Sequence, residues 1–189
     1  MKTFSCETKS LRLRPLTESD EELFVALYTD ADTMRFIEPP WTLEQATLRF
    51  RKTISQQERS VPGSRFLVIA RKNVQTPLGI CGTPHYDPAI QRVEVGMLLL
   101  PEGRRLGVAR EALTGFLDLV FEEQLVAEVF ARFTRGNVAA RNLASRAGFR
   151  LDSIAMEKGL GADICVWSIH RSAWRIKKTT NIRGDLCPM

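Results

Sequence analysis

The sequence predicts an α+β fold, in which a mixed, mostly antiparallel sheet of about seven strands is flanked by helices. Short apolar runs typical of strands alternate along the chain with amphipathic segments whose apolar residues recur every three or four positions. Gly, Pro, Asn and Asp stand at the boundaries between these segments, as expected for turns and helix caps. A chain of 189 residues, 44% of them hydrophobic and 26% charged, can bury a substantial core.

The first third of the chain predicts one strand and two helices. Residues 11–16 form a short strand that ends at Pro15, and Thr17, Ser19 and Asp20 are N-cap candidates for a helix that continues through Tyr28. The apolar residues of a second helix recur between Leu43 and Ile54, and the segment 61–64 ends it.

The remainder predicts six strands and two helices. Asn137 caps the shorter helix and Gly148 ends it. The strands are expected at 66–70, 77–86, 92–100, 126–134, 150–156 and 163–170, and the longer helix carries its apolar stripe from Ala109 to Phe121. Residues 1–178 are interpreted as a single domain, and residues 179–189 as a flexible tail.

Composition excludes several classes of protein. No apolar run is long enough to cross a membrane, and the first residues lack the apolar core of a signal peptide. The four cysteines, Cys6, Cys81, Cys165 and Cys187, are scattered without metal-ligand spacing, which predicts neither a metal site nor a disulfide framework. A cytoplasmic location fits this cysteine usage.

The net charge of +5 raises the question of nucleic-acid binding. The basic residues are interleaved with acids, however, and cluster only at Arg104-Arg105 and between Arg171 and Lys178. No DNA- or RNA-binding motif accompanies them, so nucleic acid is not the expected partner.

The loop from Glu102 to Ala109 is the strongest functional signal in the sequence. It lies between an apolar strand and the long amphipathic helix, and backbone N–H groups at a helix start attract anions. Gly107 would let a ligand approach the backbone closely. A plain structural turn is the alternative.

The loop reads Arg104-x-x-Gly107-x-Ala109, which resembles the [QR]-x-x-G-x-[GA] acetyl-coenzyme A loop of the GNAT N-acetyltransferases. Further similarity lies at Glu111-Ala112, at Asn137 with Gly148-Phe149, and in the opening segment 10–20. Together they are most similar to the ribosomal-protein acetyltransferase branch, and the resemblance extends from about Leu11 to about Trp174.

This resemblance implies acetyl-coenzyme A as cosubstrate, with no metal. It assigns the pyrophosphate to the loop and the pantetheine arm to a bulge in the strand 92–100. Gly96, a glycine inside a strand pattern, agrees with such a bulge. The residues expected to bind the cofactor are Met97, Leu98, Leu99, Arg104, Arg105, Leu106, Gly107, Val108, Ala109, Asn137 and Asn142.

Glu94 is the candidate catalytic residue. Strand alternation places Val93, Val95, Met97 and Leu99 on one face, and Glu94 on the other with Gly96, Leu98 and Leu100. A partly desolvated carboxylate suits a general base, and the family commonly uses a glutamate on this strand, acting through water, to deprotonate the amine. The structural alternative is an ion pair with Arg92 or Arg65.

The sequence departs from many GNAT enzymes at Ala144, where a tyrosine would protonate the leaving thiolate. The ribosomal-protein branch often lacks this tyrosine as well. His85, Tyr86 and Ser145 are the nearby candidates for the acid, and water is the alternative.

These observations favour an N-acetyltransferase that acts on a primary amine, either a protein N-terminal amine or a lysine. The alternatives are an acetyltransferase for a small-molecule amine, such as an antibiotic or a polyamine, and an inactive acyl-coenzyme A-binding regulator. We expect selectivity for the acceptor to lie in residues 33–62 and in the last strands. A homodimer is compatible with the sequence.

Overall fold

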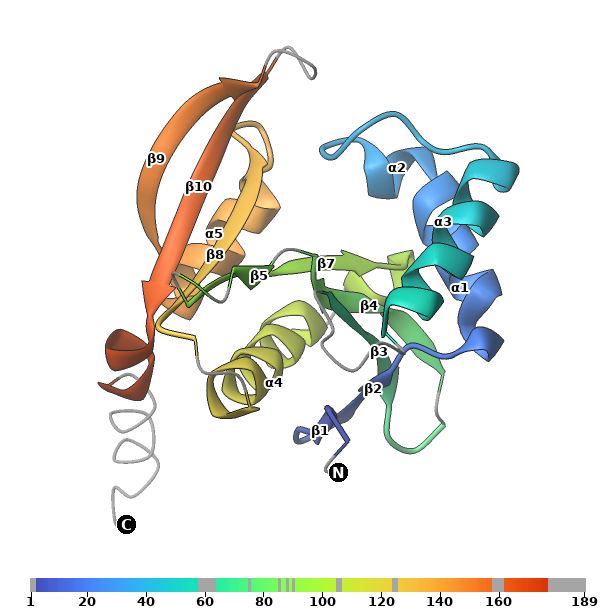
Figure 1. Cartoon of the computed structure of the whole chain (residues 1–189), viewed down its shortest axis with the longest axis horizontal. Coiled ribbons are helices and arrows are strands. Elements are labelled where there is room, and N and C mark those ends of the chain that lie inside the picture. Colours follow the sequence, from blue (N-terminus) through green and yellow to red (C-terminus); the bar gives the residue numbers. More distant parts are fainter. Residues whose placement is uncertain are drawn as a thin grey trace.

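The computed structural model describes residues 3–57, 64–74, 76–84, 86–87, 89, 91–104, 107–123, 126–157 and 162–176. Two five-stranded sheets form its centre (Figure 1). The first has the order β1 (Cys6–Glu7), β2 (Leu11–Pro15), β3 (Arg65–Arg71), β4 (Pro77–Thr83) and β7 (Gly96–Leu99). The second has the order β5 (Tyr86–Asp87), β6 (Arg92–Glu94), β8 (Glu128–Thr134), β10 (Ala162–His170) and β9 (Arg150–Glu157).

Helices cover both faces of the first sheet (Figure 1). In β3, Leu67 and Ile69 join the core under α4 (Val108–Glu123), whereas Val68 and Ala70 join the core under α1 (Glu21–Thr29) and α3 (Leu43–Gln57). The strand is therefore apolar on both sides, which explains why its sequence is a continuous apolar run rather than an alternation.

An ion pair between the buried Asp20 and the half-buried Arg14 fixes the chain between β2 and α1. Both oxygens of Asp20 accept hydrogen bonds from Arg14, at 2.8 and 2.7 Å, and Oδ2 also accepts from the backbone N–H and the hydroxyl of Thr17. A short 3₁₀ turn, η1 (Glu18–Asp20), precedes α1, so the predicted cap region does hold the helix start. The carboxylate thereby satisfies the backbone N–H of Thr17, one of the groups that a helix start leaves without partners.

The second sheet carries α5 (Val138–Ala147) against β8 and α4. Asn137 is the N-cap predicted from the sequence, since its side chain accepts from the backbone N–H of Ala140 at 3.0 Å. Gly148 ends the helix with a positive φ of 96°, a conformation that favours glycine.

The predicted strand 92–100 is divided between the two sheets. Glu94 pairs with Phe130 of β8 in parallel, and the N–H of Val95 still donates to the carbonyl of Phe130 at 2.8 Å. From Gly96 onward the chain pairs with β4 in the antiparallel direction. The described pairing of β6 and β7 has a continuous register, so the bulge expected beside Gly96 is not found there; instead, this is the point at which the two sheets separate.

The other predicted helices and strands are present, with boundaries shifted by a few residues. The structure adds elements too short for a periodic pattern: β1, α2 (Ala31–Met34), the turn η2 (Pro101–Arg104) and helical residues at 171–176. The predicted strand 77–86 ends at Thr83, and β5 begins separately at Tyr86. Among the described helices, none has the length and apolar character to cross a membrane. The proposed tail 179–189 lies outside the described residues.

Candidate active site

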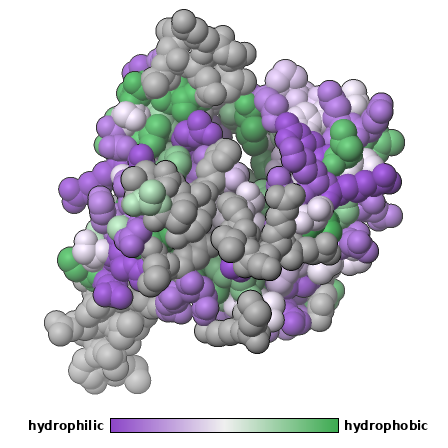
Figure 2. Space-filling model, in the orientation of Figure 1, coloured by the Kyte–Doolittle hydropathy of each residue, from purple (hydrophilic) through white to green (hydrophobic). Residues whose placement is uncertain are grey.

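A cavity of about 620 Å³ lies where β7 and β8 separate. In Figure 2 a hollow with apolar side chains beside it separates the half that contains β8 from the half that contains α2 and α3. The lining comes from both faces of the sheets. Leu113 of α4 and Ala140, Leu143 and Ala144 of α5 line one side, and Tyr28, Phe36, Ile37 and Phe66 line the other. Two ligands that enter this cavity from opposite faces of the sheets can therefore come into contact inside it.

Backbone groups of β7 face the opening toward β8. The N–H of Leu100 donates to Leu78 of β4 at 2.9 Å, and the carbonyl of Leu98 lies against Gly79 of β4. Because backbone groups alternate along a strand, the N–H groups of Met97 and Leu99 point the other way. Since β7 is the edge strand of its sheet, these groups can pair with an extended ligand.

The N-terminus of α4 lies just beyond the end of β7. The carbonyl of Gly107 accepts from the N–H of Glu111 at 3.0 Å, so Gly107 is the N-cap. The N–H groups of Gly107, Val108, Ala109 and Arg110 therefore have no partner within the helix. Gly107 has a φ of 77°, and a Cβ there would meet no atom within 4 Å. The N-terminus of α4 therefore offers backbone N–H donors, the positive end of the helix dipole and open space, which are the features that a pyrophosphate-binding site requires.

The side chain of Arg104 makes contacts within the protein that the sequence did not indicate. Its Nε donates to the carbonyl of Leu99 at 3.1 Å, and its Nη2 donates to the hydroxyl of Thr33 at 2.5 Å and lies 3.7 Å from Asp30. Hydrogen bonds from Thr33, with the charge of Arg104, hold the pKa of Asp30 below its usual value. Arg104 therefore ties the loop to α2. Arg105 and Leu106 lie outside the described residues.

Glu111, singled out by the resemblance, positions α4. One carboxylate oxygen accepts from the hydroxyl of Thr8 at 2.5 Å and from the N–H of Ser10 at 2.6 Å, and the other accepts from the hydroxyl of Ser10 at 2.8 Å. The first turn of α4 is thereby held on the turn between β1 and β2.

Glu94 is buried and lines the cavity. Val93 and Val95 pack into the core under α4, whereas Leu98 and Leu100 pack with the α1 and α3 core, as the alternation predicted. Glu94 thus faces the α1 and α3 side. Its ion-pair partner is neither Arg92 nor Arg65: Oε1 accepts from Nε of Arg132 at 3.1 Å.

The partners expected from neighbouring sequence are engaged elsewhere. Arg92 forms ion pairs with Glu128 and Asp152, and the guanidinium of Arg65 lies 4.8 Å from the centre of the Phe4 ring. Strand pairing brings Arg132 to Glu94 because β6 and β8 are parallel neighbours. No local sequence pattern indicates this contact.

Of the remaining predicted site residues, Asn137 lines the cavity and Asn142 does not, since it is exposed on α5. Ala144, in place of the family's tyrosine, is buried and also lines the cavity. Ser145 is exposed away from the lining. His85 and the side chain of Tyr86 lie outside what the structure describes.

Thr134, at the end of β8, is a further candidate site residue, which the sequence did not reveal. Its hydroxyl is buried, and no hydrogen-bond partner for it exists among the described residues. Thr134 lines the cavity. Because a buried polar atom without a partner destabilises a protein, this hydroxyl marks a position where a ligand can supply the missing bond.

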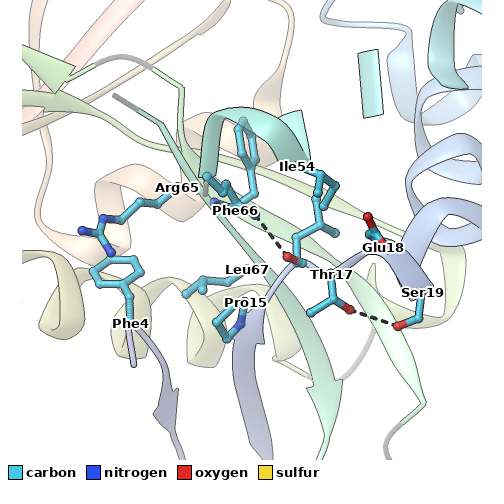
Figure 3. A pocket seen from close by; sticks show the side chains of 11 residues that line it. Phe4, Pro15, Thr17, Glu18, Ser19, Ile54, Arg65, Phe66 and Leu67 are labelled. Atoms are coloured by element: carbon cyan, nitrogen blue, oxygen red, sulfur yellow. Dashed lines mark hydrogen bonds between the residues drawn. The ribbon is translucent and has the colours of Figure 1, made fainter. Parts of the chain in front are cut away.

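A second pocket of about 520 Å³ lies where β2 ends and β3 begins, beside Ile54 of α3 (Figure 3). The hydroxyls of Thr17 and Ser19, which line it, lie 3.0 Å from each other. The carboxylate in its described lining is that of Glu18, which is exposed. This pocket has neither the opened strands nor the helix N-terminus of the larger cavity.

Comparison with known families identifies the class of protein. Residues 10–150 match the family described as acetyltransferase (GNAT) domain. This match covers most of the chain, which therefore belongs to the GNAT acetyltransferases. The expectation of an acetyl-coenzyme A-dependent N-acetyltransferase is confirmed. No curated protein sequence matches the chain.

Solved structures show the same fold. A GNAT acetyltransferase from Bacillus anthracis is 17% identical, with a TM-score of 0.76 over 89% of this chain and 99% of its own. Spermidine N-acetyltransferase from Vibrio cholerae, in complex with CoA and spermine, is 19% identical, with a TM-score of 0.76 over 87% and 97%. RimL, a ribosomal L7/L12 alpha-N-protein acetyltransferase in complex with coenzyme A, is 15% identical, with a TM-score of 0.75 over 88% and 97%.

Proposed function

We propose that this enzyme transfers the acetyl group of acetyl-coenzyme A directly to a primary amine, most simply the N-terminal amine or a lysine of a protein, as in the ribosomal-protein branch. The observation that carries the proposal is one cavity that reaches both faces of the sheet where β7 and β8 separate. Cofactor and acceptor can meet there without a covalent enzyme intermediate.

The cofactor is assigned to the α4 side. The N–H groups from Gly107 to Arg110 bind the pyrophosphate, and the edge of β7 pairs with the pantetheine arm. The N–H of Met97 is the candidate donor to the thioester oxygen, where negative charge increases in the transition state. Asn137 supplies a polar contact beside the arm. Thr134, two positions after Arg132 on β8, shares the face of Arg132 and Glu94 and is therefore assigned to the acceptor side.

The acceptor is assigned to the opposite side, with Glu94 as base. An amine is mostly protonated at neutral pH and must lose a proton before its lone pair can attack the acetyl carbon. Glu94 takes that proton through a water molecule, using Oε2, since Oε1 is bonded to Arg132. The C–N bond then forms and the C–S bond breaks. The nitrogen releases its second proton to water, and the thiolate takes a proton from water.

The test is to incubate the protein with acetyl-coenzyme A and a library of amines and peptides, following free thiol and acetylated product by mass spectrometry. Thiol release that requires an amine, with a matching acetylated product, supports the proposal. Tight binding of acetyl-coenzyme A without any amine-dependent thiol release would identify the non-catalytic regulator instead.

A further inference from the structure

The acceptor side of the cavity has an apolar wall. We use the name acceptor wall for Tyr28, Phe36, Ile37, Phe66 and Leu98, which come from α1, the segment after α2, β3 and β7. Leu98 and Phe66 pack with the α1 and α3 core, which places this wall on the same face as Glu94 and opposite α4. An acceptor that reaches Glu94 must therefore pass over apolar side chains.

The wall is held in place by aromatic stacking. The ring of Tyr28 lies 4.3 Å from that of Trp41, with 9° between their planes, and 4.4 Å from that of Phe24. Burial, with the nearby charge of Glu38, raises the pKa of Tyr28 to about 12, so the phenol stays neutral. The wall is a preformed, uncharged surface, and Ile37 at its end remains 39% exposed.

Charge in the cavity is limited. The charged side chains among its described lining are Glu38, Glu94 and Arg132, which are two carboxylates and one guanidinium and sum to −1. The ion pair between Arg132 and Glu94 balances two of them, which leaves the carboxylate of Glu38 in excess. One ammonium group matches this balance, whereas a polyamine would bring additional cations without partners.

We infer that the acceptor is a primary amine carried directly on a large apolar group, which for a peptide means an N-terminal residue with a large apolar side chain. This inference rests on the proposed function and specifies its substrate class. The ammonium enters past Glu38 toward Glu94, and the apolar group lies on the acceptor wall.

The test compares kcat/KM within two series: n-alkylamines from propyl to hexyl, and tripeptides that begin with Ala, Val, Leu, Phe, Asp or Lys. The pKa of the amine is nearly constant among the n-alkylamines, so differences in that series report on the apolar group. In the peptides, mass spectrometry of the product distinguishes the α-amine from the side-chain amine of Lys, whose pKa is higher. Burial of one methylene contributes about 0.8 kcal/mol, or about fourfold. We expect kcat/KM to rise about two- to fourfold for each added methylene.

Two matched variants locate the effect. Ile37→Ser removes apolar surface from the wall at an exposed position and should flatten the dependence on chain length. Leu48→Ser changes an exposed residue of α3 outside the cavity and should leave it unchanged. Spermidine should react more slowly than hexylamine.

The outcomes separate this inference from the proposed function. A flat series, or a preference for spermidine or for peptides beginning with Asp or Lys, overturns the apolar acceptor while acetyl transfer stands. If no amine in either series increases the release of free thiol, the proposed function is overturned. A length dependence confined to alkylamines supports the apolar group and assigns it to a small molecule, which contradicts the protein acceptor.

Discussion

Replacing Gly107 by Asp and, separately, by Asn tests the proposed pyrophosphate site with a pair of variants that differ in charge but hardly in shape. Both residues tolerate the left-handed conformation that a φ of 77° requires better than other side chains do. Neither meets a steric obstacle at the Cβ, since no atom lies within 4 Å of that position. Strain is therefore similar in the two variants and cancels when they are compared.

The expected difference follows from Coulomb's law. At a separation of about 6 Å, two like charges repel by about 0.7 kcal/mol at a dielectric constant of 80 and by about 3 kcal/mol at 20. A pyrophosphate diester carries two negative charges, so the lower limit is about 1.4 kcal/mol, or tenfold. Coenzyme A should bind Gly107→Asp at least about tenfold more weakly than Gly107→Asn.

Without ligand, the thermal stability of the Asp variant should equal or exceed that of the Asn variant. A negative charge at the N-terminus of α4 interacts favourably with the helix dipole by about 0.3–1 kcal/mol, so the Asp variant should melt no lower than the Asn variant. Calorimetric titration with coenzyme A and thermal melts with and without it measure both quantities. Salt should narrow the difference in affinity. Equal affinities at low ionic strength would refute the assignment of the pyrophosphate to this loop.

Three further predictions concern the base Glu94, the buried hydroxyl of Thr134 and the ion pair of Asp20. Glu94→Gln should lower kcat by about 10²-fold or more and leave coenzyme A affinity nearly unchanged, whereas normal turnover from pH 6 to 9 would restrict Glu94 to its ion pair with Arg132. Thr134→Val should leave the unliganded protein as stable or more stable and raise the KM for the amine about fivefold, with recovery in Thr134→Ser; an unchanged KM would contradict a ligand contact. Burial favours the neutral form of Asp20, but hydrogen bonds from Arg14 and Thr17 outweigh it and lower the pKa of this carboxyl below its usual value of 3.8. The contribution of this carboxylate to stability is therefore fully present above its unfolded pKa and is lost as the pH falls through its lower folded pKa. Asp20→Asn should lower the free energy of unfolding by about 2–3 kcal/mol at pH 7 and by much less below about pH 4, as measured by urea unfolding. A difference in stability that does not change with pH would contradict this account.

The sequence by itself determined the features that depend on local spacing. The amphipathic period of α4 and the loop before it located the candidate anion site, because N–H groups without partners occur at every helix start. Asn137 and Gly148 marked both ends of α5 for the same local reason. Strand alternation also assigned Glu94 to the face opposite Val93 and Val95.

Only the tertiary structure decided which distant groups meet at that site. Arg132 pairs with Glu94 across 38 positions, and Arg104 reaches Thr33 across 71. The chain passes from one sheet to the other at Val95, and the acceptor wall combines α1, β3 and β7. Hydrophobic periodicity specifies which face of an element is buried, but it does not specify which element covers that face. The partner of Glu94, the burial of the Thr134 hydroxyl and the apolar character of the acceptor side therefore depend on how the two sheets pack.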